Sequence, residues 1–169
     1  MRLAGITQES TVDGPGLRFV IYAQGCVHKC PHCHNPESWM SDGGREFSVK
    51  EIVRLLKKQK KIKRGITFSG GEPFLQAAEF FEIAVAARNL GLDVVTYTGF
   101  TYDQLLEDED RRALLSVSNI LIDGKYMHEL RDIGLQFCGS SNQRVIDVEA
   151  TQSCGDIVLW SSERAAFSA

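Results

Sequence analysis

Three of the five cysteines and three of the four histidines lie within the nine residues 26–34. The cysteines are Cys26, Cys30 and Cys33, separated by three and then by two residues. Thiolates at this spacing can converge on one metal centre, because the short connections between them form a loop around it. Three thiolates are one ligand short of a tetrahedral zinc site or of a closed four-iron cluster. Either a histidine supplies the missing ligand, or one iron stays open to an external ligand.

A structural zinc site is the plainer interpretation of this loop. His28, His32 and His34 are each close enough in sequence to provide a fourth ligand. The spacing alone does not separate zinc from an iron cluster, so a zinc-stabilised interaction module is the non-enzymatic alternative.

The composition is that of an ordinary globular protein, with 43% hydrophobic and 24% charged residues. A chain of 169 residues predicts a single domain, with a core in residues 1–150 and a tail of unknown role in 151–169. The net charge of −3 gives no reason to expect nucleic acid or an anionic membrane as a partner. An odd number of clustered cysteines and no long apolar run indicate a cytoplasmic protein.

Strand patterns alternate with helix patterns along most of the chain. Helices are expected to begin at Ser48, at Phe74 and at Thr101, where Ser48 and Thr101 each have Glu or Gln three residues later. The pattern leaves residues 1–16 as a turn-rich segment and predicts strands at 17–23, 66–68, 92–97, 119–122 and 145–148. This alternation predicts a parallel α/β fold, and 169 residues are too few for an eight-stranded barrel of about 250 residues. A partial, open β/α barrel is therefore expected.

Four unusual loops each follow one of these predicted strands directly. They are the cysteine loop and residues 70–73, 98–99 and 123–125. The carboxyl ends of parallel strands open on one face, where ligands bind. The four loops are therefore expected to line one site.

Three of these loops carry groups that could bind a small ligand. Gly70 and Gly71 let the backbone approach a ligand closely, although a plain turn with Glu72 at the start of the next helix is the alternative. Asp123 and Lys125 could point the same way as an opposite-charge pair, the carboxylate suiting ribose hydroxyls and the ammonium suiting a carboxylate. A surface turn is the alternative for that pair.

The basic run at residues 57–64 is typical of a solvated helix end, where cations favour the helix dipole. A docking patch for an acidic electron donor is the alternative.

Several of these motifs together resemble a known family. The cysteine loop followed by His34 and Asn35, with residues 70–73 after the next strand, resembles the radical S-adenosylmethionine activases of glycyl radical enzymes. Residues 13–16, 97–100, 123–125 and 139–143 are similar, more narrowly, to the activases of anaerobic (class III) ribonucleoside-triphosphate reductase. The resemblance spans residues 11 to about 148, most of the chain.

The resemblance implies a fold and a cluster. The fold would be the partial, open parallel β/α barrel of the radical S-adenosylmethionine type. Cys26, Cys30 and Cys33 would hold a 4Fe–4S cluster, and its open iron would be chelated by S-adenosylmethionine. His32 would lie along the adenine, with Cys33 and His34 supplying backbone contacts.

The resemblance also implies contacts to the rest of S-adenosylmethionine. Gly70, Gly71 and Glu72 would receive the methionine amino group. Asp123 would face the ribose, and Lys125 would face the methionine carboxylate.

The implied reaction is a one-electron cleavage of S-adenosylmethionine to methionine and a 5′-deoxyadenosyl radical. That radical would take a hydrogen atom from the Cα of one glycine in the reductase. The implied partners are the glycyl radical subunit of the reductase and a low-potential electron donor such as flavodoxin or ferredoxin. An activase of another glycyl radical enzyme, of the pyruvate formate-lyase type, is the alternative.

Overall fold

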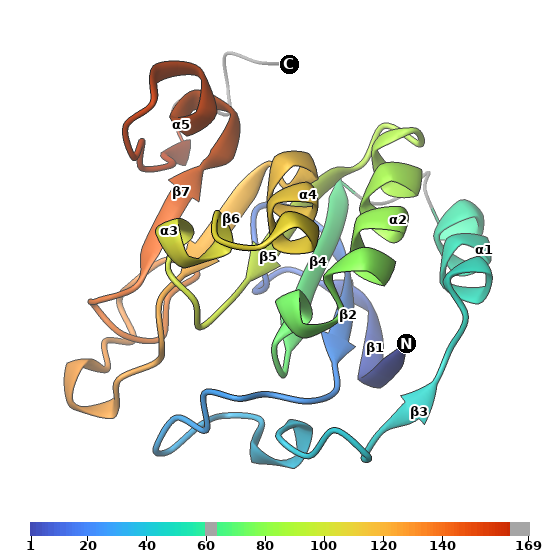
Figure 1. Cartoon of the computed structure of the whole chain (residues 1–169), viewed down its shortest axis with the longest axis horizontal. Helices are drawn as coiled ribbons and strands as arrows, with labels where there is room; N and C mark the ends of the chain where they lie inside the picture. Colours follow the sequence, from blue (N-terminus) through green and yellow to red (C-terminus); the bar gives the residue numbers. More distant parts are fainter. Residues whose placement is uncertain (60–63, 163–169) are drawn as a thin grey trace.

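The computed structural model describes residues 1–59 and 64–162 and is built around one seven-stranded sheet (Figure 1). The strand order across the sheet is β3-β1-β2-β4-β5-β6-β7. The strands are β1 (Arg2–Ser10), β2 (Arg18–Ala23), β3 (Arg45–Glu46), β4 (Gly65–Gly70), β5 (Asp93–Tyr97), β6 (Ile120–Asp123) and β7 (Arg144–Asp147).

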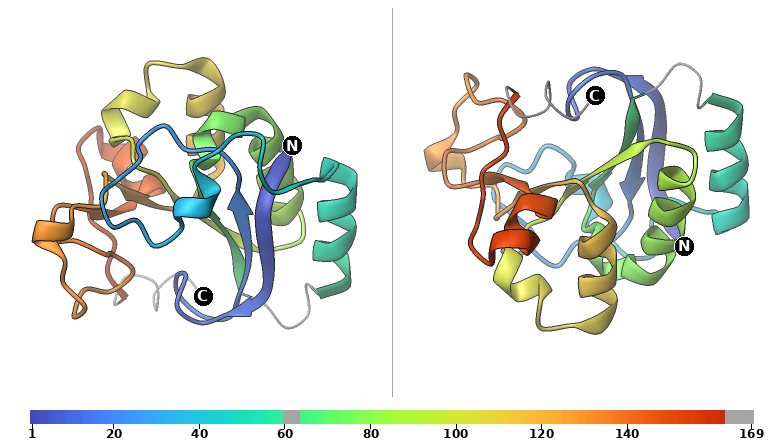
Figure 2. Two further views of the ribbon diagram at one scale, coloured as in Figure 1. Left: turned by 90° about the horizontal axis from the view of Figure 1, so that it is seen from below. Right: turned by 90° about the horizontal axis from the view of Figure 1, so that it is seen from above.

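The helices lie along one face of the curved sheet (Figure 2). The α-helices are α1 (Val49–Gln59), α2 (Ala77–Arg88), α3 (Tyr102–Leu105), α4 (Glu109–Val117) and α5 (Val148–Cys154). Short 3-10 turns occur at η1 (Pro36–Ser38), η3 (Pro73–Gln76) and η4 (His128–Leu130). No helix within residues 1–59 and 64–162 has the length and apolar character that crossing a membrane requires.

The four central strands, β2, β4, β5 and β6, run parallel to one another, as the alternating pattern predicts. The expectation of a wholly parallel sheet is wrong at both edges. β1 pairs antiparallel with β2 and with β3, and β7 pairs antiparallel with β6. Among the described residues β3 and β7 are the two free edges, so the sheet is open and mixed.

The sequence pattern predicts neither the two-residue strand β3 nor the longer strand β1. Its buried and exposed residues do not alternate regularly, and its register with β2 is interrupted by two irregularities. A strand of this kind carries little periodic signal, because pairing with its neighbour stabilises it rather than burial of one face.

The helix starts predicted at Ser48 and Thr101 are confirmed by their capping contacts, whereas the helix predicted from Phe74 begins as the 3-10 turn η3 and becomes the α-helix α2 at Ala77. The Ser48 backbone N–H donates to Glu51 at 2.7 Å, and Thr101 and Gln104 form a reciprocal capping box. The helix predicted from Thr101 ends after one turn as α3, and α4 follows as a second helix because the Asp108 side chain accepts from the Arg111 N–H.

The core lies between the sheet and the helices α1, α2 and α4. Phe19, Phe68 and Phe80 are completely buried there, and the rings of Phe68 and Phe80 meet edge to face at 4.7 Å. Because β2, β4, β5 and β6 run parallel, the loops that follow them lie at the same end of the sheet (Figure 1).

The described part of the basic run lies at the amino ends of the parallel strands, opposite the cysteine loop. Lys57 and Lys58 end α1, which leads to the start of β4, whereas the cysteine loop follows the end of the parallel strand β2. Residues 60–63 of the run lie outside the described residues. The alternative that the basic run is a docking patch for an electron donor stays a prediction.

Candidate functional site

The cysteine loop leaves the end of β2 and is held by short backbone contacts. Gly25 donates to the carbonyl of Ser38 at 2.8 Å, and Cys26 donates to that of Trp39 at 3.1 Å. Within the loop, Lys29 and His32 have positive φ angles of 47° and 58°. Non-glycine residues adopt this left-handed conformation only when the surroundings impose it, so the loop has a defined shape.

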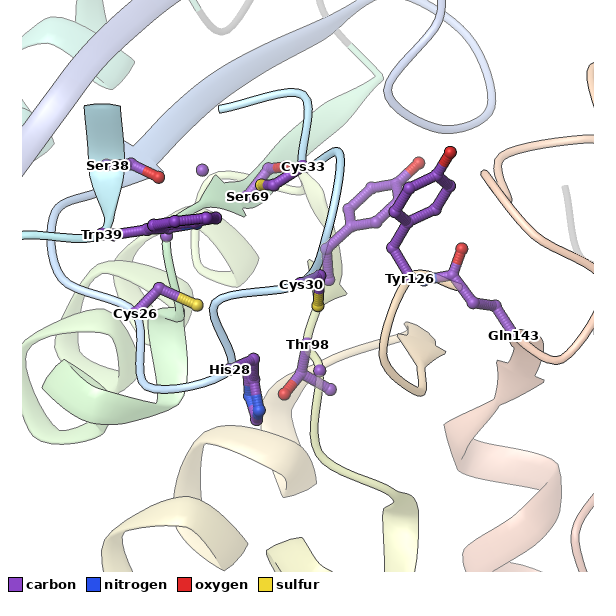
Figure 3. Close-up of a pocket in the computed structure, with 14 residues that line it drawn as sticks. Cys26, His28, Cys30, Cys33, Ser38, Trp39, Ser69, Thr98, Tyr126 and Gln143 are labelled. Atoms are coloured by element: carbon purple, nitrogen blue, oxygen red, sulfur yellow. The ribbon is translucent and has the colours of Figure 1, made fainter. Parts of the chain in front are cut away.

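The three cysteines line one cavity of about 150 Å³, which Gly70 and Gly71 also line (Figure 3). Its other lining residues come from the ends of β4 and β5, from the loops after β2, β5 and β6, and from the segment before β7: His28, Ser38, Trp39, Ser69, Tyr97, Thr98, Gly99, Tyr126 and Gln143. The cysteine loop and residues from 70–73 and 98–99 therefore meet at this cavity, whereas the loop 123–125 lines a neighbouring one.

Backbone N–H groups are directed at the cysteine sulfurs. The Asn35 N–H donates to Cys33 Sγ at 3.4 Å. Burial raises the pKa of the Cys26 thiol, while the N–H groups of His28 and Lys29 act in the opposite direction. Hydrogen bonds of this kind stabilise the thiolate, which is the form that binds metal.

Cys30 has a similar environment. Burial raises the pKa of its thiol, the Tyr126 N–H and the Lys125 ammonium lower it, and Cys33 raises it. Burial outweighs the contributions of Tyr126 and Lys125, so the pKa of the Cys30 thiol is raised overall.

The three cysteines line one cavity, and thiolate ligands suit both zinc and an iron–sulfur cluster. Within the part of the chain that the structure describes, no three His, Cys, Asp or Glu side chains gather closely enough to hold one metal ion.

Trp39 provides a second sign that the cavity accepts a polar group. Among the described residues, its indole Nε1 is the buried side-chain nitrogen that has no hydrogen-bond partner. Trp39 lines the same cavity as the cysteines (Figure 3). A buried N–H without an acceptor is costly, and a bound group with sulfur or oxygen acceptors would remove that cost.

The histidines proposed as a fourth zinc ligand have other partners. His28 Nε2 lies 2.8 Å from Glu72 Oε2. The His32 ring stacks on that of His128 at 4.1 Å, and the His34 ring lies 5.3 Å from that of Tyr126. His32 and His34 do not line the cavity, so the structure does not bring these two side chains to the cysteines.

Glu72 does not have the position expected of a ligand for an amino group. It is completely buried, and its carboxylate accepts from the Phe74 and Gly99 N–H groups at 3.1 and 2.9 Å. The Thr98 hydroxyl donates to both of its oxygens, and His28 is a further partner. The alternative that Glu72 caps the following turn is therefore correct, because its acceptors are used within the protein.

Gly70 and Gly71 lie in the cavity wall, as expected. A Cβ on Gly71 would approach the Gly25 carbonyl oxygen to 2.3 Å, so only glycine fits against the cysteine loop. The N–H groups of Gly71 and Glu72 donate to the carbonyls of Ala23 and Gly25. The groups that this turn can present to an amine are therefore carbonyl oxygens.

Asp123 and Lys125 do not form the expected pair. Asp123 is 1% exposed and accepts from the Arg144 guanidinium at 2.9 Å and from the Tyr102 N–H at 2.8 Å. Lys125 is exposed. Both residues line a neighbouring cavity of about 480 Å³, which shares Gly99 with the cysteine cavity.

Several residues of the cavity have no sequence signal that separates them from structural residues. Trp39 reads as a packing residue, and Thr98 and Gln143 are ordinary polar residues. His28 is different, because its place between two cysteines could have identified it as a residue of the site.

Comparisons with known proteins show the family of the chain. Residues 12–146 match the family model described as "4Fe-4S single cluster domain". The anaerobic ribonucleoside-triphosphate reductase-activating protein of Vibrio cholerae is 34% identical over 139 residues, which cover 78% of this chain and 88% of the relative. The protein of that name from Escherichia coli K12 is 32% identical, with coverage of 79% and 90%.

A second group of relatives is longer than this chain. The pyruvate formate-lyase 1-activating enzyme of Escherichia coli K12 is 30% identical over 158 residues, which cover 89% of this chain and 61% of the enzyme. The family model covers most of the chain, and the shorter relatives match it over most of both lengths. The chain therefore belongs to the 4Fe–4S single-cluster domain family, together with the anaerobic ribonucleoside-triphosphate reductase-activating proteins.

Proposed function

We propose that the chain is a radical S-adenosylmethionine activase that generates the glycyl radical of an anaerobic ribonucleoside-triphosphate reductase. The observation that carries this proposal is the single cavity lined by Cys26, Cys30, Cys33 and the glycine pair, in a chain 34% identical to a reductase-activating protein. The two cofactors are a 4Fe–4S cluster and S-adenosylmethionine.

Cys26, Cys30 and Cys33 would hold the cluster and leave one iron to S-adenosylmethionine. When bound, the cluster supplies the electron that cleaves S-adenosylmethionine, and the radical so formed removes a hydrogen atom from a glycine of the partner. The indole N–H of Trp39 and the backbone N–H groups beside the sulfurs would donate hydrogen bonds to this centre.

The remaining residues would bind and orient S-adenosylmethionine. The carbonyl oxygens of Gly70 and Gly71 would accept from the methionine amino group. Lys125 would pair with the carboxylate and Asp123 would face the ribose; their cavity is next to the cysteine cavity, and Gly99 lines both. These residues contribute orientation and exclusion of water, which shorten the path of the radical to its target.

The fold would be a partial β/α barrel of the radical S-adenosylmethionine type, formed by residues 1–169 as one domain. The open, seven-stranded sheet supports this, because an incomplete barrel leaves a side through which a glycine loop of a large partner can enter. A low-potential donor such as flavodoxin or ferredoxin would approach the end of the sheet that carries the cysteine loop. The basic end of α1 lies at the opposite end.

Anaerobic reconstitution and electron paramagnetic resonance test the proposal. The reconstituted protein is expected to contain four irons and four sulfides, and to give a glycyl radical on the reductase when supplied with S-adenosylmethionine and a reductant. Cys30→Ala is expected to abolish both the cluster and the radical. Cys154→Ala, at the exposed end of α5, is the matched control and is expected to retain both.

Two results would contradict the proposal. A colourless protein with one zinc would indicate the interaction module, and a radical at the wild-type level in Cys30→Ala would exclude the assigned role of the cysteine. The 30% identity to a pyruvate formate-lyase activase supports the second candidate partner. A radical formed on pyruvate formate-lyase and not on the reductase would transfer the assignment to that partner.

A further inference from the structure

We infer that His28 is a positioning residue: through the buried carboxylate of Glu72 it holds the cysteine loop in shape before any cluster binds. This inference rests on the proposed function, in which the cysteines hold a cluster. It assigns to His28 and Glu72 a task that is separate from binding S-adenosylmethionine.

The carboxylate of Glu72 joins three loops at the carboxyl ends of the parallel strands. It belongs to the loop after β4, and it accepts from Thr98 Oγ1 and the Gly99 N–H in the loop after β5. His28 of the cysteine loop is its third connection, at 2.8 Å. Because Glu72 is 0% exposed, water does not compete for these contacts, and each is stronger than it would be at the surface.

His28 is placed to transmit this constraint to the cysteines. It lies two residues from both Cys26 and Cys30 and is followed by Lys29, whose φ of 47° is unfavourable for a side chain of that kind. The His28 side chain is 6% exposed, and its ring meets that of Phe100 edge to face at 4.6 Å. An ionised carboxylate can only accept, so the His28 Nε2 carries the hydrogen in this contact.

The His28 ring packs tightly against the backbone of Gly99. A Cβ on Gly99 would lie 2.4 Å from His28 Cδ2 and 2.7 Å from its Nε2, so no larger residue fits unless the ring moves. The backbone of Gly99 does not have a positive φ, and alanine is therefore excluded there by the His28 ring and not by backbone strain. A substitution 71 residues away in sequence should thus disturb the cysteine loop.

The rate of iron loss to a ferrous chelator, measured anaerobically on the reconstituted full chain without S-adenosylmethionine, tests this inference. His28→Ala and Gly99→Ala are each expected to lose iron about tenfold faster than the wild type, in the range found for residues that support metal ligands. The double variant is expected to be no faster than His28→Ala, because the ring that clashes with the new Cβ is gone. His28→Gln, which retains an N–H donor, is expected to recover part of the slow rate.

Thr96→Val is the matched control. It removes the buried hydrogen bond of 2.8 Å between Thr96 Oγ1 and Ser118 Oγ, which lies outside the cysteine cavity. It is expected to lower the melting temperature and to leave the rate of iron loss unchanged. A variant of His28 that merely destabilised the fold would behave like this control.

The outcomes separate the two proposals. A wild-type chain that takes up no cluster contradicts the proposed function. A wild-type chain that holds the cluster, with His28→Ala and Gly99→Ala losing iron at the wild-type rate, overturns the positioning role alone. The positioning role is also overturned if Gly99→Ala speeds iron loss by the same factor in the wild type and in His28→Ala.

Discussion

The side chain of Asp123 illustrates how the surroundings of a residue decide its role. In the sequence it follows a strand and precedes Lys125, and the two charges suggest a ligand-binding pair. In the structure Arg144 is its ion-pair partner, and this contact raises the pKa of the Arg144 guanidinium above its ordinary value. A ribose that approaches Asp123 would therefore meet a carboxylate already bound by a cation.

Arg144→Leu tests this pairing. Asp123 would keep the Tyr102 N–H and lose its cationic partner, so the free energy of unfolding is expected to fall by about 1–3 kcal/mol. Urea denaturation followed by circular dichroism measures the change. Arg54→Leu, on the exposed side of α1, is the control and is expected to change stability by less than about 0.5 kcal/mol. Equal effects of the two substitutions would show that the Asp123 contact contributes nothing.

At the scale of elements, the two ends of the parallel strands have separate roles. The loops at the carboxyl ends of the parallel strands surround the cysteine cavity. At the amino ends, a buried charge holds the strands together. Arg18, at the start of β2, is completely buried and donates to Thr67 Oγ1 at 2.7 Å and to the Ile66 carbonyl at 2.6 Å. It also pairs with Asp93 at the start of β5, so one side chain connects β2, β4 and β5.

Arg18→Met tests whether this connection supports the fold and not the site. Removing one partner of a buried ion pair costs about 3–5 kcal/mol, and the lower value is expected because Asp93 keeps Arg64 at 3.2 Å. Urea denaturation should show the loss of stability. The iron content after reconstitution below the unfolding transition should match the wild type, because Arg18 lies at the opposite end of β2 from the cysteine loop. Loss of the cluster from a folded Arg18→Met protein would contradict this separation.

At the scale of the whole molecule, the fold and the cluster site have different sources of stability. In the part of the chain that the structure describes, the buried apolar clusters contain no residue of the cysteine loop, residues 26–35. The fold is therefore expected to persist without the cluster, unlike small metal-dependent domains that unfold when the metal is removed.

Hydrogen exchange of the reconstituted and cluster-free proteins, measured by mass spectrometry, tests this independence. Peptides from β2, β4 and β5 are expected to keep the same protection in both forms, because their hydrogen bonds and core contacts do not involve the cluster. Peptides covering residues 26–35 are expected to exchange faster without it. Loss of protection throughout the sheet would show that the cluster is needed for folding.

The sequence by itself determined the features that depend on near neighbours. The apolar periods of residues 17–23 and 92–97 predict β2 and β5, and Ser48 with Glu51 predicts the start of α1. The cysteine spacing and the position of each loop after a strand predict which loops meet. These signals are readable because hydrophobic period, caps and turns act over a few residues.

The tertiary structure alone decided the features that join distant residues. β1 and β7 take antiparallel places at the sheet, Glu72 bonds to His28 across 44 residues, and Asp123 bonds to Arg144 across 21. The position of Glu72 before a helix indicates its contact with the Phe74 N–H, but nothing local indicates that His28 and Thr98 use Glu72 or that Arg144 uses Asp123. A carboxylate becomes a ligand or a structural acceptor according to which distant groups surround it, and only the folded chain brings those groups together.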